Sequence, residues 1–285
     1  MIVMSKNAKR KPENQHNQAK GLSTMAEGWL SSCCNAEQRT FLFLYLIVYV
    51  AVWYFGHTII AKPMRLLATA IHELSHALAC WCTGGTVLNL EVYESAAGVT
   101  RYQGGWKWLI ACAGYLGEAF FGALFVIMSG GRRTSTAAAI GLMLSLLASL
   151  CYKPNRVLIC ITLTYVLLTI GVVVVEWWYY SPTLPYLILT YGVFLGTYAI
   201  SDIFNHLIVN SIEGSDAYSI YEDSGRAICC MPRCVGFTWL IFAIFFQLFG
   251  IYLALILMSE ECRDHGWFQC LLLSKLELNF DRFHF

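Results

Sequence analysis

The stretch from Pro63 to Gly85 reads PMRLLATAIHELSHALACWCTGG, an apolar helical segment with His72, Glu73 and His76 inside it. Residues four positions apart share one helix face, roughly 5–6 Å apart at Cβ, so the two imidazoles can bind one ion. Zinc suits that pair, with bonds of about 2.0–2.1 Å to imidazole nitrogen. Glu73 stands beside the first histidine, where a carboxylate can take a proton from a metal-bound water. The stretch therefore predicts a Zn²⁺ cofactor, His72 and His76 as ligands, and Glu73 as the catalytic base.

The alternative interpretation of this stretch is a pair of polar residues that hydrogen-bond inside a helical bundle. The composition argues against it. The chain has 285 residues, of which 58% are hydrophobic and 13% charged, the balance of a polytopic membrane protein. Ionisable residues within lipid are costly and usually mark function, which favours the metal site. A net charge of +1 predicts no nucleic-acid partner.

Apolar runs predict an all-α membrane domain over residues 41–258 with about seven transmembrane helices. A basic, disordered tail (residues 1–40) precedes this domain, and its Lys/Arg content predicts a cytoplasmic N-terminus. A polar, amphipathic tail (residues 259–285) follows it. The predicted spans are residues 41–61, 63–84, 106–129, 136–152, 157–175, 182–210 and 235–258.

His72, Glu73 and His76 form an HExxH motif, and the helix that carries them is called the HExxH helix below. A short β-hairpin is predicted directly after it. Apolar residues concentrate at Val87, Leu88, Leu90 and Val92, a turn follows, and residues 99–103 form a second short run. Such a hairpin beside a metal helix could pair its free edge with an extended substrate. An ordinary structured loop is the equally supported alternative.

The third zinc ligand must come from elsewhere, because a catalytic zinc binds three protein ligands and a water. His76 and Asp202 each lie about 12 Å, at a rise of 1.5 Å per residue, from the end of their predicted helix. If the chain crosses the membrane seven times, the helices that carry His76 and Asp202 run parallel. The ends of both helices then lie on the same side of the membrane as the N-terminal tail. Asp202 is therefore the preferred ligand, and His206 on the same face is the alternative or a hydrogen-bond partner. Asp216 in the following loop ranks lower.

Other polar positions allow two interpretations each. Glu118 lies in the middle of a predicted span and needs a partner, either behind the zinc ligands or in helix packing. Cysteines next to the first and last spans are candidates for S-palmitoylation, or they only pack against neighbouring helices. These cysteines are Cys33, Cys34, Cys229 and Cys230.

Five blocks of this sequence resemble the peptidase M50B-like membrane proteins, relatives of the site-two intramembrane zinc proteases. The blocks are HELSHALACWCTGG, GVTRYQGGWKW, AGYLGEAFFGALF, SDIFNHLI and GSDA, within residues 63–239. The resemblance implies zinc bound by His72, His76 and an aspartate from a later helix, here Asp202, with Glu73 as the base. It also implies a lipid-embedded protease whose substrates are transmembrane proteins.

Two other functions stay open from the sequence. Site-two proteases carry their aspartate in an LDG motif, whereas this chain has Ser201-Asp202-Ile203. That difference motivates a second hypothesis, a non-proteolytic relative that binds membrane partners. A transporter with buried ionisable residues along an ion path is the third, and the absence of internal repeats counts against it.

Overall fold

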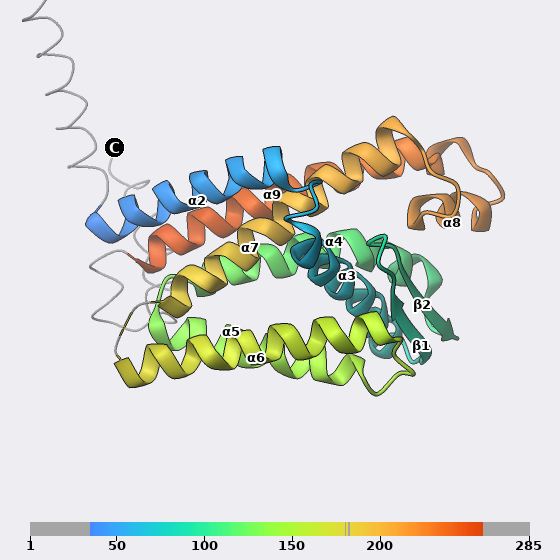
Figure 1. The fold of residues 1–285 in the computed structure, drawn as a ribbon. Helices are drawn as coiled ribbons and strands as arrows, with labels where there is room; N and C mark the ends of the chain where they lie inside the picture. The colour runs from blue at the N-terminus through green and yellow to red at the C-terminus, as the bar shows by residue number, and fades with distance from the viewer. Residues whose placement is uncertain (1–34, 180, 182, 259–285) are drawn as a thin grey trace, which may run out of the picture.

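The computed structural model describes residues 35–179, 181 and 183–258 of the chain. The described chain is mostly helical (Figure 1). Its elements are α2 (Ala36–Phe55), α3 (Lys62–Cys82), β1 (Thr86–Val92), β2 (Gly98–Gln103), α4 (Lys107–Met128), α5 (Arg132–Ser149), α6 (Arg156–Tyr179), α7 (Thr183–Asp202), η1 (Ile203–Val209, a π-helix), α8 (Asp216–Asp223), η2 (Ile228–Cys230, a 3₁₀ turn) and α9 (Pro232–Leu257).

Every predicted span has a helix at its position, but five helices of the described chain are long and apolar enough to cross a membrane. They are α2, α4, α6, α7 with η1, and α9. The predicted number of about seven is therefore not reached by this criterion. The helices at the two remaining predicted spans, α3 and α5, are less apolar. Helix α3 carries the HExxH residues, and α5 begins with Arg132-Arg133 and a Ser/Thr-rich turn. Five such helices fit an integral membrane protein.

Helix α4 lies at the centre of the bundle and contacts α3, α7 and α9. Helices α2 and α9 lie on one side of α7, and α5 and α6 lie on the other (Figure 1). Glycine allows the contact between α4 and α7, because a Cβ on Gly192 would lie 2.7 Å from the carbonyl oxygen of Gly122. The central helix is thereby held close to both the HExxH helix and the last spans.

The predicted hairpin is confirmed. Strand β1 pairs antiparallel with β2, with Leu90 opposite Thr100, and a bulge falls between Val87 and Asn89. The hairpin packs against α3, and the Leu90 N–H donates to the carbonyl oxygen of Tyr152 at 3.0 Å. The loop between α5 and α6 therefore covers part of the outer edge of β1.

Several predicted boundaries and orientations differ from the structure. Helix α2 begins at Ala36 rather than residue 41, because Asn35 and Gln38 form a reciprocal capping box. The loop predicted over residues 213–226 contains helix α8. Figure 1 shows α3 continuing toward the hairpin end of the bundle, opposite the start of α2, instead of returning to the N-terminal side.

Some predictions fall outside the described residues. Most of the predicted N-terminal tail and all of the C-terminal tail lie there, as do Cys33 and Cys34. The Cys229 side chain is likewise not described, and Cys230 packs against an apolar cluster that includes Trp239.

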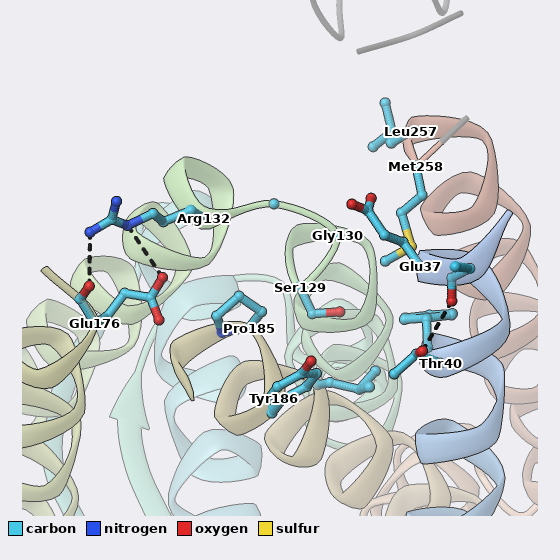
Figure 2. Close-up of a pocket in the computed structure, with 14 residues that line it drawn as sticks. Glu37, Thr40, Ser129, Gly130, Arg132, Glu176, Pro185, Tyr186, Leu257 and Met258 are labelled. Carbon is cyan, nitrogen blue, oxygen red and sulfur yellow. Dashed lines mark hydrogen bonds and ion pairs between the residues drawn. The ribbon is translucent and has the colours of Figure 1, made fainter. Parts of the chain in front are cut away.

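Two cavities matter for the position of a functional site. The larger, about 800 Å³, lies where α2 begins and α9 ends (Figure 2). Beside it, the Arg132 guanidinium lies 3.2 Å from a Glu176 carboxylate oxygen and 4.1 Å from the Trp177 ring centroid. Its described lining contains no histidine or cysteine. The smaller, about 360 Å³, is lined by His72, Glu73 and the hairpin turn, and it holds the predicted chemistry.

Candidate metal centre

Helix α3 places the HExxH side chains in the interior of the protein. Glu73 and His76 are buried, and His72 is mostly buried. The two imidazole ring centroids lie 4.8 Å apart. One ligand atom from each of His72, Glu73 and His76 lies within 4.8 Å of the others. The predicted pair of ligands and the predicted base are thus in one place.

Asp216, the first residue of α8, lies against both histidines. Its Oδ2 atom is 3.2 Å from His72 Nε2 and 3.3 Å from His76 Nε2. Ligands of a tetrahedral zinc with bonds of 2.0–2.1 Å stand roughly 3.3 Å from one another. Two imidazole nitrogens and a carboxylate are also a common donor set for catalytic zinc. The arrangement therefore fits a zinc ion held by these three side chains.

Both histidines have a second partner that fixes the ring. The Nδ1 atom of His76 lies 2.6 Å from the main-chain carbonyl oxygen of Ile110. A carbonyl only accepts, so Nδ1 carries the proton and Nε2 presents its lone pair. The Nδ1 atom of His72 lies 3.6 Å from Glu118 Oε2. Carboxylate and carbonyl partners of this kind orient metal-binding histidines and raise their basicity.

A glycine of α4 makes room for the centre. A Cβ at Gly114 would overlap the Nε2 atoms of both His72 and His76. Tyr115 follows it, with its ring edge-on to His72 at a centroid distance of 4.6 Å. The small residues of the AGYLGEA block thus bring the α4 backbone directly against the imidazoles.

The hairpin holds the Glu73 carboxylate. The hydroxyl of Thr100 on β2 lies 2.6 Å from Glu73 Oε2, within hydrogen-bond distance, and 3.0 Å from the Glu73 carbonyl oxygen. Any side chain at Gly98 would collide with the same carboxylate. The turn and β2 therefore position the predicted base.

The structure does not bring Asp202 to the histidine pair. Asp202 lines the same cavity, at the end of α7, and its Oδ2 atom lies 3.8 Å from His206 Nδ1. Among the described ion pairs, Asp216 is the aspartate that meets His72 and His76. Asp202 and Asp216 both line the cavity, and depth along a helix alone does not say which of the two acids reaches the imidazoles.

Asp216 ranks lower in the prediction because it falls within the loop predicted over residues 213–226. The chain turns back after η1 through Ser211 (φ 47°) and Gly214 (φ 85°). The Ser215 side chain then accepts from Tyr218 N and starts α8. Ser215 was thus a usable signal for a helix start with Asp216 in its first turn.

Burial raises the pKa of Asp216, but charge and hydrogen bonds from His76 and His72 outweigh it, and the net shift is downward.

A family model covers the part of the chain that contains this site. The family model described as Peptidase M50B-like matches residues 43–251, which include the HExxH helix, the hairpin, Asp202 and Asp216. No curated protein and no solved structure matches the chain.

Proposed function

Because the chain belongs to the peptidase M50B-like family, whose members are generally intramembrane zinc metalloproteases, we propose that it hydrolyses peptide bonds of transmembrane proteins. One observation carries the proposal: Asp216 Oδ2 lies 3.2 and 3.3 Å from the Nε2 atoms of the HExxH histidines. In this proposal His72, His76 and Asp216 hold the zinc. A bound zinc ion supplies Lewis acidity and lowers the pKa of water toward neutrality.

Glu73 is the proposed general base and acid. Its carboxylate is buried and adjacent to the ligand atoms, so it can accept a proton from the attacking water. It then gives that proton to the amine of the departing peptide fragment. Thr100 keeps one carboxylate oxygen in place, and it acts as a positioning residue.

The remaining neighbours act on the histidines. Ile110 fixes the His76 tautomer through its carbonyl oxygen. Glu118, which is 2% exposed, holds His72 from the far side of the ring. These contacts let both Nε2 atoms converge without rearrangement, which is what a preformed site requires.

The substrate segment must be extended when it is cut. An α-helix with its side chains is about 10–12 Å wide and hides its carbonyls in internal hydrogen bonds. The cavity of about 360 Å³ is too small for such a helix, so the cleaved stretch has to unwind. Helix-breaking residues in the substrate favour this. The edge of β2 beside Glu73 offers backbone partners to an extended segment.

The bilayer is the proposed setting, and the Lys/Arg content of the N-terminal tail supports a cytoplasmic N-terminus in this proposal. The hairpin and α8 lie at the opposite end of the bundle from the start of α2 (Figure 1). With a cytoplasmic N-terminus, the metal centre therefore opens toward the other side of the membrane.

Cleavage by purified protein tests this function. The protein is loaded with zinc in liposomes and given single-span peptides that carry a Gly-Pro break near one membrane surface. We expect cleavage by the wild type and none by Glu73→Gln with its zinc retained. A protein that binds one zinc and cuts no such peptide would instead support the non-proteolytic, partner-binding hypothesis.

A further inference from the structure

A histidine outside the HExxH helix also lines the metal cavity. His206 belongs to η1, and it shares the cavity with His72 and Glu73. Its side chain is 42% exposed, so a molecule in the cavity can reach the ring. The described ion pairs join His206 to Asp202, whereas both HExxH histidines meet Asp216. With the proposed zinc held by the latter three side chains, the His206 ring is available to a substrate.

The backbone that carries His206 has an uncommon conformation. Helix α7 ends at Asp202, and the chain continues from it directly as the π-helix η1. The wider turn shows in the Asn210 N–H, which donates to the carbonyl oxygen of Asn205, five residues earlier, at 3.0 Å. π-helical turns are rare in proteins, and they occur frequently at functional sites. The conformation of η1 therefore marks this segment independently of its side chains.

Asp202 holds the His206 ring from one side. The Asp202 Oδ2 atom lies 3.8 Å from His206 Nδ1, which is an ion-pair distance, and Tyr198 also interacts with this carboxylate. Contacts of this kind are often long before a substrate binds and tighten in the complex. A carboxylate only accepts, so the proton on Nδ1 faces Asp202, and a protonated ring carries a second N–H on Nε2. The Nε2 atom lies on the ring edge away from Asp202.

We propose that His206 donates a hydrogen bond from Nε2 to the carbonyl oxygen of the cleaved peptide bond, and that Asp202 positions the ring. This inference rests on the proposed protease function. As the water oxygen bonds to the carbonyl carbon, one electron pair of the double bond moves to the carbonyl oxygen, and the water proton goes to Glu73. The carbonyl oxygen becomes negative, and a donor aimed at it stabilises that charge. His206 transfers no proton in this step.

The rest of the cavity lining favours His206 for this role. No lysine or arginine lines the cavity among the described residues, so His206 is the side chain there that can be positive without being a proposed ligand. Two tyrosines also line it, but both have other partners. Tyr198 interacts with Asp202, and the Tyr115 ring lies against His72 and Trp239. Water is scarce in such a cavity, where a positive donor stabilises an oxyanion more strongly than in bulk water.

Two matched peptide analogues test this role without turnover. One carries a phosphinic group in place of the cleaved amide, which is tetrahedral and has a negative oxygen. The other carries a ketomethylene group, which is planar and uncharged, on the same side chains. Their dissociation constants are measured on zinc-loaded, detergent-solubilised protein, with zinc content determined for each sample. The ratio of the two constants reports stabilisation of the oxyanion, and we expect the wild type to bind the phosphinic peptide more tightly.

The main variant is His206→Leu, which removes the donor, and Asp202→Asn removes the charge that positions it. We expect the phosphinic preference to fall by about 10²–10³-fold in His206→Leu and by about tenfold or more in Asp202→Asn, with zinc retained in both. His57→Gln is the matched control, because the His57 ring contacts Ser201 Oγ at 3.0 Å and lies outside the metal cavity. If His206→Leu does not fold, His206→Gln replaces it, with a loss of about tenfold because its amide still donates.

Four results would overturn this role: no phosphinic preference in the wild type, an unchanged preference in His206→Leu, equal weakening of both analogues in that variant, or loss of its zinc. Equal weakening would make His206 structural, and loss of zinc would make it a metal ligand. Failure of the protease function looks different, because a wild-type protein that lacks zinc, or that holds zinc and binds neither analogue, fails before the variants are compared.

Discussion

The Nδ1 atom of His76 lies 2.6 Å from the main-chain carbonyl oxygen of Ile110. This contact joins the second HExxH histidine to the first turn of α4, the helix at the centre of the bundle. The imidazole nitrogen that we propose as a zinc ligand is thus oriented by the same helix that contacts α7 and α9. The fold and the site depend on one another at this point.

Glu73→Gln tests the proposed base. The amide keeps the shape of the side chain but cannot take a proton, so we expect cleavage to fall by about 10²–10⁴-fold with zinc content unchanged. The measurement is the cleavage rate of a single-span peptide beside zinc analysis of the same sample. Glu94→Gln is the control, since Glu94 pairs with Lys62 and is exposed. Full activity in Glu73→Gln contradicts the assignment.

Gly114→Ala tests the close approach of α4 to the histidines. The added methyl group would overlap both Nε2 atoms, so we expect zinc affinity to fall by about tenfold or more. Gly141→Ala on α5 is the matched control, because a Cβ there meets nothing within 4 Å. Zinc affinity is measured by competition with a chelator. Equal affinities in the two variants would show that α4 does not shape the centre.

Thr100→Val tests the contact between the hairpin and the base. Valine keeps the branched shape and removes the hydroxyl that lies 2.6 Å from Glu73 Oε2. We expect the cleavage rate to fall by about 10–100-fold, the usual effect of losing an orienting partner, while zinc stays bound. Thr164→Val on α6 controls for the substitution itself, because that hydroxyl bonds only within its own helix. A loss of zinc in Thr100→Val would mean that β2 supports the ligands instead.

Gly192→Ala tests the packing of α7 against α4. A Cβ at this position would lie 2.7 Å from backbone atoms of Gly122 and Val126. Because backbone cannot move aside as a side chain does, we expect a loss of about 1–3 kcal/mol in the free energy of unfolding. Thermal unfolding in detergent measures it, with Gly171→Ala, which meets nothing within 4 Å, as the control. Equal thermal unfolding midpoints for Gly192→Ala and Gly171→Ala would contradict the close contact between α7 and α4.

Local patterns predicted much of this structure. The HExxH spacing identified residues that converge in space, and alternating apolar residues identified β1 and β2. Apolar runs located the helices because a segment that crosses lipid must be apolar along most of its length. These are properties of single stretches of chain, and they can be derived without knowing where other stretches lie.

The contact between α3 and α8 could not be derived in that way. Asp202 and Asp216 both line the cavity beside the HExxH helix, and depth along a helix does not separate them. The choice depends on the turn through Ser211 and Gly214, which brings the start of α8 back over the imidazoles. The predicted number of about seven spans is not confirmed, because α3 and α5 occupy two of the predicted positions but are less apolar than the five candidate spans.

Zinc content of two aspartate variants tests the central claim most directly. Asp216→Ala and Asp202→Ala are purified in parallel, and bound zinc per protein is measured by elemental analysis after dialysis against a weak chelator. The account predicts that Asp216→Ala loses its zinc, because one of three ligands is gone, whereas Asp202→Ala keeps a full equivalent. A full equivalent in Asp216→Ala together with loss from Asp202→Ala would contradict it.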